Sequence, residues 1–481
     1  MSKTPTAVKR DEIGAAAAIP YPARAYVPAP RHRHRHAIRL IYVVVYPQHD
    51  EPLSPDKRQR GERLLLAESG LARAMATSTS GMFLTGLALA LGANVLQYGK
   101  LAGAVFVGGS LHLLVVPLLH TFGSRRRFCL AGLGMTRLLR ISLAAAPLLL
   151  VWGMSPAGVM WVMFVVLLLS AITGTASETA RQSWMSDLIP KARLGRFIGW
   201  RSAIMRCAAM SAVLGYSQFI EFWRGTGQEL VVGFQYMILF ATGLGVIGLV
   251  CLSRAPEPWM SERLSPALHR FAITLPFRDR RFRRFMAFHC GWMFSTSLAG
   301  MFFHLYMLDY LQLQHRPNGY LLVAATDIIS MLLGVASAPI WGRLADRWGT
   351  KRVLMRAGMV MVIFPLLWIP ITPERWWLIY VVILLRVFGS ANEIGLMKMG
   401  MQLAPRRRRS VYISVYRSLG CVMLAIAPMV GGAIAHAAGS SLWVFGSFTF
   451  AGLHLLFVIS TAGRLASLWW LRRVRLDDRP T

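Results

Sequence analysis

Long apolar stretches alternate with short polar turns along most of the chain. A helix needs roughly 20 mainly apolar residues to cross the hydrocarbon core of a bilayer, and stretches such as WVMFVVLLLSAITG at 161–174 fit this requirement. The pattern predicts twelve membrane spans. They cover about 71–96, 101–122, 127–153, 156–180, 198–220, 230–252, 285–309, 317–340, 352–371, 376–398, 411–436 and 441–463.

The predicted spans fall into two groups of six, separated by a longer polar stretch. Residues 1–68, which include RHRHRH at 31–36, are expected to form a largely disordered, basic cytoplasmic tail that can touch anionic lipid headgroups. The remaining predicted parts are a six-helix bundle at 69–252, a cytoplasmic linker at 253–284, a second six-helix bundle at 285–465 and a cytoplasmic tail at 466–481.

Composition supports a membrane protein. The 481 residues are 55% hydrophobic and only 15% charged, whereas soluble domains carry about a quarter charged residues. The formal net charge is +32, which in a soluble chain would suggest nucleic-acid binding. Here the basic residues are divided among loops on one side of the predicted membrane, so we expect no nucleic-acid partner.

The connecting segments alternate strictly in charge. Basic segments lie at 124–127, 191–196, 277–284, 346–352, 406–409 and 472–475, and the segments between them hold few bases. Because cytoplasmic loops of membrane proteins are enriched in Lys and Arg, we expect a multi-pass protein of the plasma (inner) membrane with both termini in the cytoplasm.

The two predicted halves resemble each other in sequence. GTASE at 174–178 and GSANE at 389–393 lie 215 residues apart, and the same offset places DLIP at 187–190 on QLAP at 402–405. FGSRRR at 122–127 likewise resembles WGTKR at 348–352. Internal repeats of this kind are typical of secondary transporters.

The segment GRLADRWGTKR at 342–352 resembles the cytoplasmic loop pattern G-x-L-A-D-R-x-G-x-K/R-K/R of the major facilitator superfamily. This resemblance implies an all-α membrane protein whose twelve transmembrane helices form two pseudo-symmetric six-helix bundles. It also implies a cytoplasmic gate at the matching positions, which are Gly342, Asp346, Arg347, Gly349, Lys351 and Arg352. The first-half copy is degenerate, with Val116 and His120 at two of the fixed positions.

Glu178 and Glu393 are related by the repeat and lie near the cytoplasmic ends of spans 4 and 10. We expect them to belong to the same gate and to pair with loop arginines when the cytoplasmic side closes. Proton relay is the alternative, because apolar surroundings favour the protonated form of a carboxylate.

Ionisable residues at bilayer depth cost roughly 2.5 kcal/mol or more and usually face a cavity or a partner. Asp327 and Arg386 each lie about ten residues into spans 8 and 10, so we expect them to pair at mid-depth or to flank a substrate; a fixed structural ion pair is the alternative. Arg206 could meet an anionic substrate or pair with Glu178. His289 in span 7 is a further candidate for the substrate or coupling site.

No phosphate-binding GxxxxGK[ST] loop, HExxH motif or clustered cysteine pattern occurs in the sequence, so neither an enzyme nor a bound cofactor or metal is expected. The sequence therefore predicts a monomeric secondary active transporter that moves a small-molecule substrate by alternating access, with a proton as the coupling ion. The alternative is a non-transporting membrane scaffold, assembly factor or sensor built on the same fold.

Overall fold

The computed structural model describes residues 54–111, 124–257, 274–405, 409–439, 443–445, 448–450 and 452–474. The chain divides into two units, residues 1–47 and residues 48–481, and every described residue belongs to the second. The predictions for most of the N-terminal tail, for Val116 and His120, and for the centre of the linker therefore lie outside the described residues.

The first half of the described chain is helical. Its elements are α1 (Pro55–Thr77), α2 (Gly81–Ala90), α3 (Val95–Ser110), α5 (Arg125–Ala144), α6 (Ala146–Val151), α7 (Pro156–Leu188), α8 (Lys191–Gly225) and α9 (Leu230–Ser253). Span 1 is divided into α1 and α2, and span 3 is divided into α5 and α6. Span 2 begins as α3, and α7, α8 and α9 are spans 4, 5 and 6.

The second half contains the remaining elements. They are α11 (Arg280–Gly300), α12 (Phe302–Leu305), the π-helical η1 (Tyr306–Tyr310), the 3₁₀ turn η2 (Leu313–His315), α13 (Gly319–Arg347), α14 (Thr350–Ile363), η3 (Leu366–Trp368), α15 (Leu378–Ile383), η4 (Leu384–Arg386), α16 (Val387–Leu403), α17 (Arg409–Ala438), β1 (Trp443–Phe445), β2 (Phe448–Phe450) and α18 (Gly452–Arg472). β1 and β2 form a short antiparallel hairpin before α18.

Among the described residues, seven continuous helices are long and apolar enough to cross a membrane. They are spans 4, 5, 6, 8, 10, 11 and 12. Spans 1, 3, 7 and 9 are interrupted by turns, and span 2 runs into residues outside the described part. Span 10 also changes locally to a 3₁₀ turn at η4, and such a change within a helix often marks a hinge or a functional position.

Span 1 differs from its predicted limits of 71–96. Its helix begins at Pro55, where the Ser54 side chain accepts a hydrogen bond from the Lys57 amide, and α2 ends at Ala90. Asn94 is the N-cap of α3 and forms a reciprocal capping box with Gln97. A polar cap, not the end of the apolar stretch, therefore sets the boundary between spans 1 and 2.

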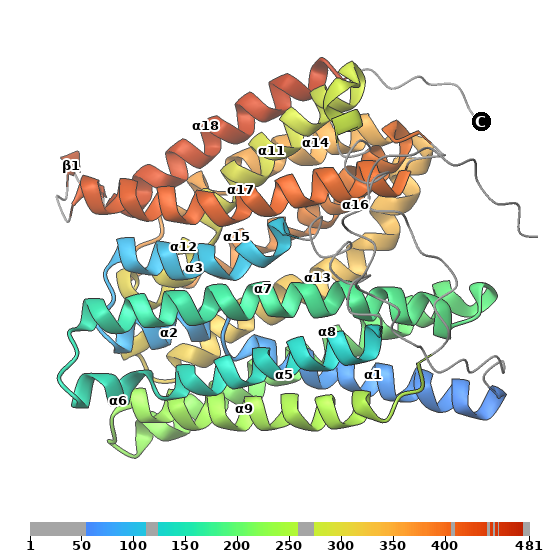
Figure 1. Ribbon diagram of the computed structural model, residues 1–481. Coiled ribbons are helices and arrows are strands. Elements are labelled where there is room, and N and C mark those ends of the chain that lie inside the picture. Colours follow the sequence, from blue (N-terminus) through green and yellow to red (C-terminus); the bar gives the residue numbers. More distant parts are fainter. Residues whose placement is uncertain are drawn as a thin grey trace, which may run out of the picture. The chain divides into compact units, whose positions relative to one another are not determined.

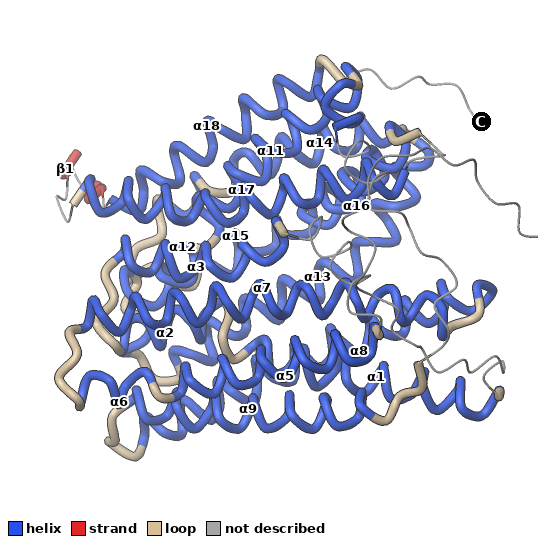
Figure 2. Tube along the Cα trace, in the orientation of Figure 1, coloured by secondary structure: helices blue, strands red, loops and turns tan. Residues whose placement is uncertain are grey.

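Successive spans run in opposite directions, as the sequence colours of Figure 1 show, and Figure 2 shows that the described chain is mostly helical. We call the end of the bundle where α1 begins and α18 ends the basic end, because the basic segments beside α5, α13 and α14 lie there. The other end, which carries α6 and β1, is called the opposite end.

The described residues of the two halves meet mainly through α3 with α17, α8 with α13, and α2 with α12 and η1. The closest approach is between α3 and α17, where a Cβ on Gly99 would lie 2.5 Å from the carbonyl oxygen of Pro428 and 2.9 Å from Cα of Gly432. No larger residue fits at Gly99 without moving the backbone, so glycine permits this contact. Small residues serve the same purpose in other membrane helix pairs.

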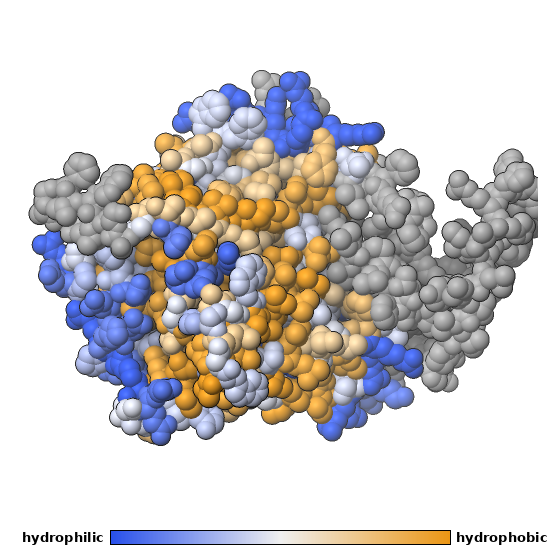
Figure 3. Space-filling model, turned by 60° about the vertical axis from the view of Figure 1, so that its left-hand side comes forward, coloured by the Kyte–Doolittle hydropathy of each residue, from blue (hydrophilic) through white to orange (hydrophobic). Residues whose placement is uncertain are grey.

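The outer surface of both halves is apolar. Large hydrophobic side chains are exposed on several helices, for example Leu138 (64%), Trp161 (56%), Phe240 (62%) and Leu332 (51%). Figure 3 shows a broad hydrophobic area bordered by hydrophilic residues. In water such an area would be unusual for a monomeric protein, and it is the expected surface for contact with lipid.

Candidate functional site

A His–Asp pair lies between spans 7 and 8. Nε2 of His304, on α12, is 3.1 Å from both carboxylate oxygens of Asp327, on α13. An ionised carboxylate only accepts hydrogen bonds, so with Asp327 ionised the donor of this contact is Nε2–H of His304. The pair is partly accessible, with 19% of the His304 side chain and 28% of the Asp327 side chain exposed.

His304 of this pair lies beside the first half of the chain, at the break in span 1. A Cβ placed on Gly81, the first residue of α2, would lie 3.5 Å from the His304 ring. Before this break the Ser78 and Ser80 hydroxyls donate to carbonyls of the last turn of α1. The break in span 1 of one half therefore lies beside the histidine of the His–Asp pair in the other half.

Asp327 does not pair with Arg386, contrary to the sequence-based expectation. The Ser337 and Ser390 hydroxyls are 2.6 Å apart and mark a common depth on α13 and α16. Asp327 lies ten residues before Ser337, whereas Arg386 lies only four residues before Ser390. At 1.5 Å per residue this separates the two levels by about 9 Å along the helices, so equal counts into the two spans did not mean equal depth.

Arg386 closes the 3₁₀ turn η4 and is exposed. The nearby Arg464, on α18, is 3% exposed and donates a hydrogen bond of 2.6 Å to the Met361 carbonyl. Its Nε has no hydrogen-bond partner, and Arg386 lies within electrostatic range of it. No described carboxylate forms an ion pair with either arginine.

The first half contains a buried ion-pair network that joins α1, α5, α7 and α8. Glu68 is fully buried, forms an ion pair with Arg181, and has its Oε1 3.6 Å from Nη2 of Arg137. Arg181 also pairs with Glu178, which accepts a second hydrogen bond of 3.0 Å from Arg201. These three arginines neutralise both carboxylates of the network.

The repeat-related glutamates have different surroundings. Glu178 has two arginine partners in its own half, at positions 181 and 201. The 215-residue offset places Leu396 and Tyr416 at the corresponding positions of the second half. Glu393 is exposed and forms no ion pair with a described residue. The pairing with loop arginines that is expected when the cytoplasmic side closes stays a prediction.

The loop with the superfamily-like pattern lies at the basic end. Asp346 is 73% exposed and forms an ion pair with Lys398 on α16, and Lys351 donates to the carbonyls of Arg472 (3.0 Å) and Val474 (2.7 Å) at the end of α18. Gly349 has φ of +85° in the turn that joins α13 to α14. Gly342 lies in the last part of α13, and Arg347 and Arg352 are exposed.

The first half has a related arrangement despite its degenerate sequence. Arg126 donates to the Ser253 carbonyl at the end of α9, as Lys351 does for α18. Arg125 is buried, lies 2.5 Å from the Asp187 carboxylate and bonds the Ser183 carbonyl, so it ties α5 to α7. All these contacts at the basic end remain within one half.

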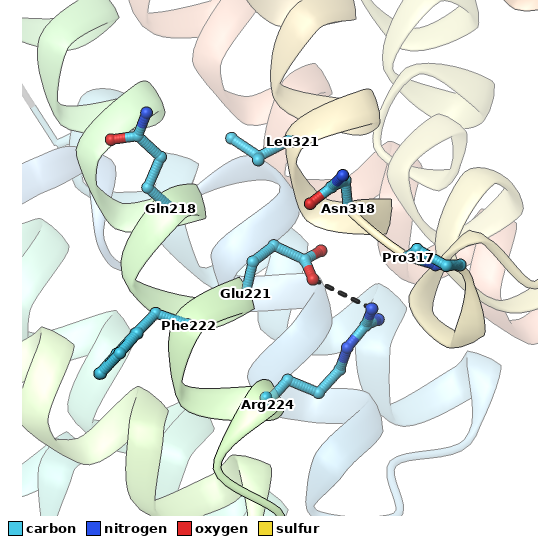
Figure 4. Close-up of a pocket in the computed structure, with 8 residues that line it drawn as sticks. Gln218, Glu221, Phe222, Arg224, Pro317, Asn318 and Leu321 are labelled. Carbon is cyan, nitrogen blue, oxygen red and sulfur yellow. Dashed lines mark ion pairs between the residues drawn. The ribbon is translucent and has the colours of Figure 1, made fainter.

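The opposite end contains a polar latch between the halves, and Figure 4 draws its first-half residues Glu221 and Arg224. Arg224, at the end of α8, donates hydrogen bonds of 2.5 Å to the carbonyls of Gln314 and Arg316. Glu221 lies 3.0 Å from Arg224 and accepts a hydrogen bond of 2.6 Å from the Tyr320 amide. Close to the same end, the Tyr98 hydroxyl donates to the Met301 carbonyl over 2.7 Å.

The latch residues also line a cavity of about 480 Å³ at the seam between α8 and α13. Gln218 and Glu221 border it from α8, and Asn318 and Leu321 border it from α13 (Figure 4). Glu221 and Arg224 belong to the latch, so this cavity marks where the two halves meet at the opposite end.

The last two candidates lie apart from the His–Asp pair. Arg206 is exposed on α8 and does not pair with Glu178, whose described partners are Arg181 and Arg201. His289 is 6% exposed and lies inside the second half between Phe285, with 6.0 Å between ring centroids, and Tyr416, at 5.1 Å. Within the described residues, no group of three or more His, Cys, Asp or Glu is placed to hold a metal ion.

The sequence reasoning missed several of these residues. Glu68 is the last residue of the segment predicted to be a cytoplasmic tail, and Arg464 falls one residue beyond the predicted end of span 12. Arg181 could have been found, because it follows Glu178 by three residues and thus lies on the same helix face.

Comparisons with known proteins agree on one family. The family model described as Major Facilitator Superfamily matches residues 68–428 and 320–480. No curated protein matches the chain. Among solved structures, a point mutant of the nucleoside transporter NupG has 12% identity and a TM-score of 0.68, covering 86% of this chain and 99% of that one. An inward-facing, unoccupied bacterial homologue of the human lysosomal transporter Spinster has 13% identity and a TM-score of 0.61, covering 89% and 100%.

Proposed function

Because the chain belongs to the major facilitator superfamily, we propose that it is a secondary active transporter that moves a small solute across the membrane by alternating access. In this mechanism two bundles rock about a central site, so that the site opens to one side at a time. The breaks in spans 1 and 7 and the 3₁₀ turn in span 10 provide places where the helices can bend.

The distribution of contacts between the halves carries this proposal. The hydrogen bonds that join described residues of the two halves lie toward the opposite end, at Tyr98, Glu221 and Arg224. The ion pairs at the basic end each join helices of one half, as Asp346 with Lys398 does. This asymmetry is expected of a transporter closed at one end, whereas a rigid scaffold has no need of it.

The basic end is cytoplasmic in this proposal, because positive residues stay on that side. The structure then corresponds to a state open toward the cytoplasm. Closing that side would bring the loop at 342–352 and the exposed Glu393 toward the first half. There the exposed Arg127, Arg193 and Arg196 form no ion pair with a described residue.

Protons are the proposed coupling ion, bound at the His304–Asp327 pair. The pair is partly accessible, and its His304 ring lies beside Gly81 of the first half. A proton at this position changes the charge of a group at the seam between the halves. Such a charge change can favour one of the two conformations, since a difference of about 1.4 kcal/mol shifts their ratio tenfold.

The test is uptake into vesicles that contain the purified protein, measured across a panel of labelled solutes with and without a pH gradient. We expect at least one solute to accumulate, and to do so less when a protonophore removes the gradient. If the rate of uptake does not depend on the pH gradient, proton coupling is refuted but the proposed transport function is not. If no solute moves although the protein is folded and inserted, the non-transporting scaffold is the better description.

A further inference from the structure

Arg386 faces the first half of the chain. Gly395, nine residues further along α16, lies on the other side of that helix and packs against Leu354 of α14. Glu393, seven residues from Arg386, lies on the same side as Arg386. The side that carries Arg386 is therefore turned away from α14 and away from the outer part of its own half.

Contacts on both flanks of the Arg386 side of α16 show which helices lie next to it. On one flank Ser390 bonds Ser337 of α13, and on the other Gly400 contacts Tyr416 of α17. α13 and α17 are the helices that pack on α8 and α3 of the first half. A side chain that lies between them points to the space between the two halves and is not directed toward lipid.

The charges around Arg386 are positive in excess. Buried Arg464 lies within electrostatic range of Arg386 and has no carboxylate partner among the described residues. Glu393 is two turns away, about 10 Å along the helix, and Asp327 is held by His304. In the first half, Glu68 and Glu178 already have arginine partners.

A further exposed arginine comes from the first half. Arg206 precedes Arg224 by 18 residues, which is five turns of helix, so both lie on the same side of α8. Arg224 bonds the second half at 314 and 316. Arg206 therefore points toward the second half as well, at a level where it is exposed and forms no ion pair with a described residue.

We propose that the substrate is a water-soluble anion, with a carboxylate or phosphate group that binds the guanidinium of Arg386 and is shared with Arg206 when the halves close around it. Arginine suits this role because its planar group donates two parallel hydrogen bonds to a carboxylate or phosphate. The proposal rests on the transport function above and names the chemical class of its substrate.

The test uses a small-molecule extract of bacterial cells, separated into anionic, neutral and cationic fractions, as the probe. Each fraction is incubated with the full-length protein in lipid nanodiscs, and retained compounds are identified by mass spectrometry. We expect a compound from the anionic fraction to be retained. Its binding should weaken about tenfold or more in Arg386→Gln and less in Arg386→Lys, which keeps the charge but not the planar fork. Arg375→Gln, which removes an exposed arginine at the other end of span 10, is the matched control and should bind like the parent.

Other results would overturn the inference in distinct ways. Retention from the neutral or cationic fraction alone, or of an anion that Arg386→Gln still binds equally, would refute the anion site and leave the transport function intact. Retention of an anionic phospholipid alone would assign the site to lipid and also refute the inference. If no fraction yields a retained compound, the proposed function fails together with the inference. Size-exclusion profiles of all variants show whether a loss of binding reflects misfolding.

Discussion

His304 of span 7 and Asp327 of span 8 form a polar pair within the second half, with Nε2 of His304 3.1 Å from each carboxylate oxygen of Asp327. Asp327→Asn and His304→Gln should each slow uptake, because either change removes the charge-assisted hydrogen bond of the pair. The free-energy change that corresponds to the slower uptake should be smaller in the double variant than the sum of the changes in the two single variants.

Asp327 and Arg386 should instead behave independently. Residues without shared partners usually show additive effects within about 0.5 kcal/mol, and these two lie at different depths. The measurement is a double-mutant cycle on thermal unfolding with Asp327→Asn and Arg386→Gln, run beside the cycle for Asp327 and His304. A larger coupling for Asp327 with Arg386 would contradict the observed geometry.

Glu68→Gln should destabilise the first half strongly. It removes a fully buried carboxylate that neutralises Arg137 and Arg181, and an unpaired buried charge costs about 3–5 kcal/mol in soluble proteins. The monodisperse yield and the thermal midpoint should both fall. Glu62→Gln, on the same helix but without a described ion pair, is the control and should change neither.

Arg224→Gln should favour conformations open at the opposite end, because it removes the two hydrogen bonds to the carbonyls of Gln314 and Arg316. If the two hydrogen bonds stabilise the closed conformation by about 1.4 kcal/mol, their loss would raise the population of the conformations open at the opposite end tenfold. Distance distributions between spin labels on the two halves measure this population. Arg316→Gln is the matched control, since that side chain bonds Pro373 in its own half; an equal shift in both variants would exclude a latch role for Arg224.

Asp346→Asn should reduce turnover more than it reduces yield. Asp346 is 73% exposed and its pair with Lys398 lies on the surface, where ion pairs contribute about 0–1 kcal/mol to stability. A role in closing the basic end would instead appear in the transport rate. Unchanged transport would leave Asp346 with no part in gating.

The orientation of the chain can be checked with reporter fusions. Fusions after residues 195, 280 and 350 should report cytoplasmic positions, and fusions near 155, 226 and 314 should report external ones. These positions alternate between the basic and the opposite ends. One robust inversion would refute the assignment of the basic end to the cytoplasm.

The fold could be predicted because it follows from apolar length, loop charge and the repeat; the family match now establishes the expected all-α fold of two six-helix halves. The breaks in spans 1, 7 and 9 could not be predicted, because apolar composition continues through them. The loop at 342–352 was correctly placed between spans 8 and 9.

The candidate site was harder to predict than the fold. The number of residues into a span gives a depth only if every span begins at the same level. Asp327 and Arg386 show that spans 8 and 10 begin at different levels. His304 carried no signal that distinguished it from other polar residues of span 7. The Glu68 network joins residues 133 positions apart, from Glu68 to Arg201, and tertiary packing alone brings them together.

In the latch at the opposite end, side chains of the first half bond main-chain atoms of the second half. Arg224 bonds two carbonyls, Glu221 accepts from an amide, and Tyr98 bonds a carbonyl. Substitutions at Gln314, Arg316 or Met301 therefore leave the bonded atoms in place, and homologues can vary freely there. An insertion or deletion between 311 and 319 would displace those atoms, so the length of this loop, more than its composition, should be under selection.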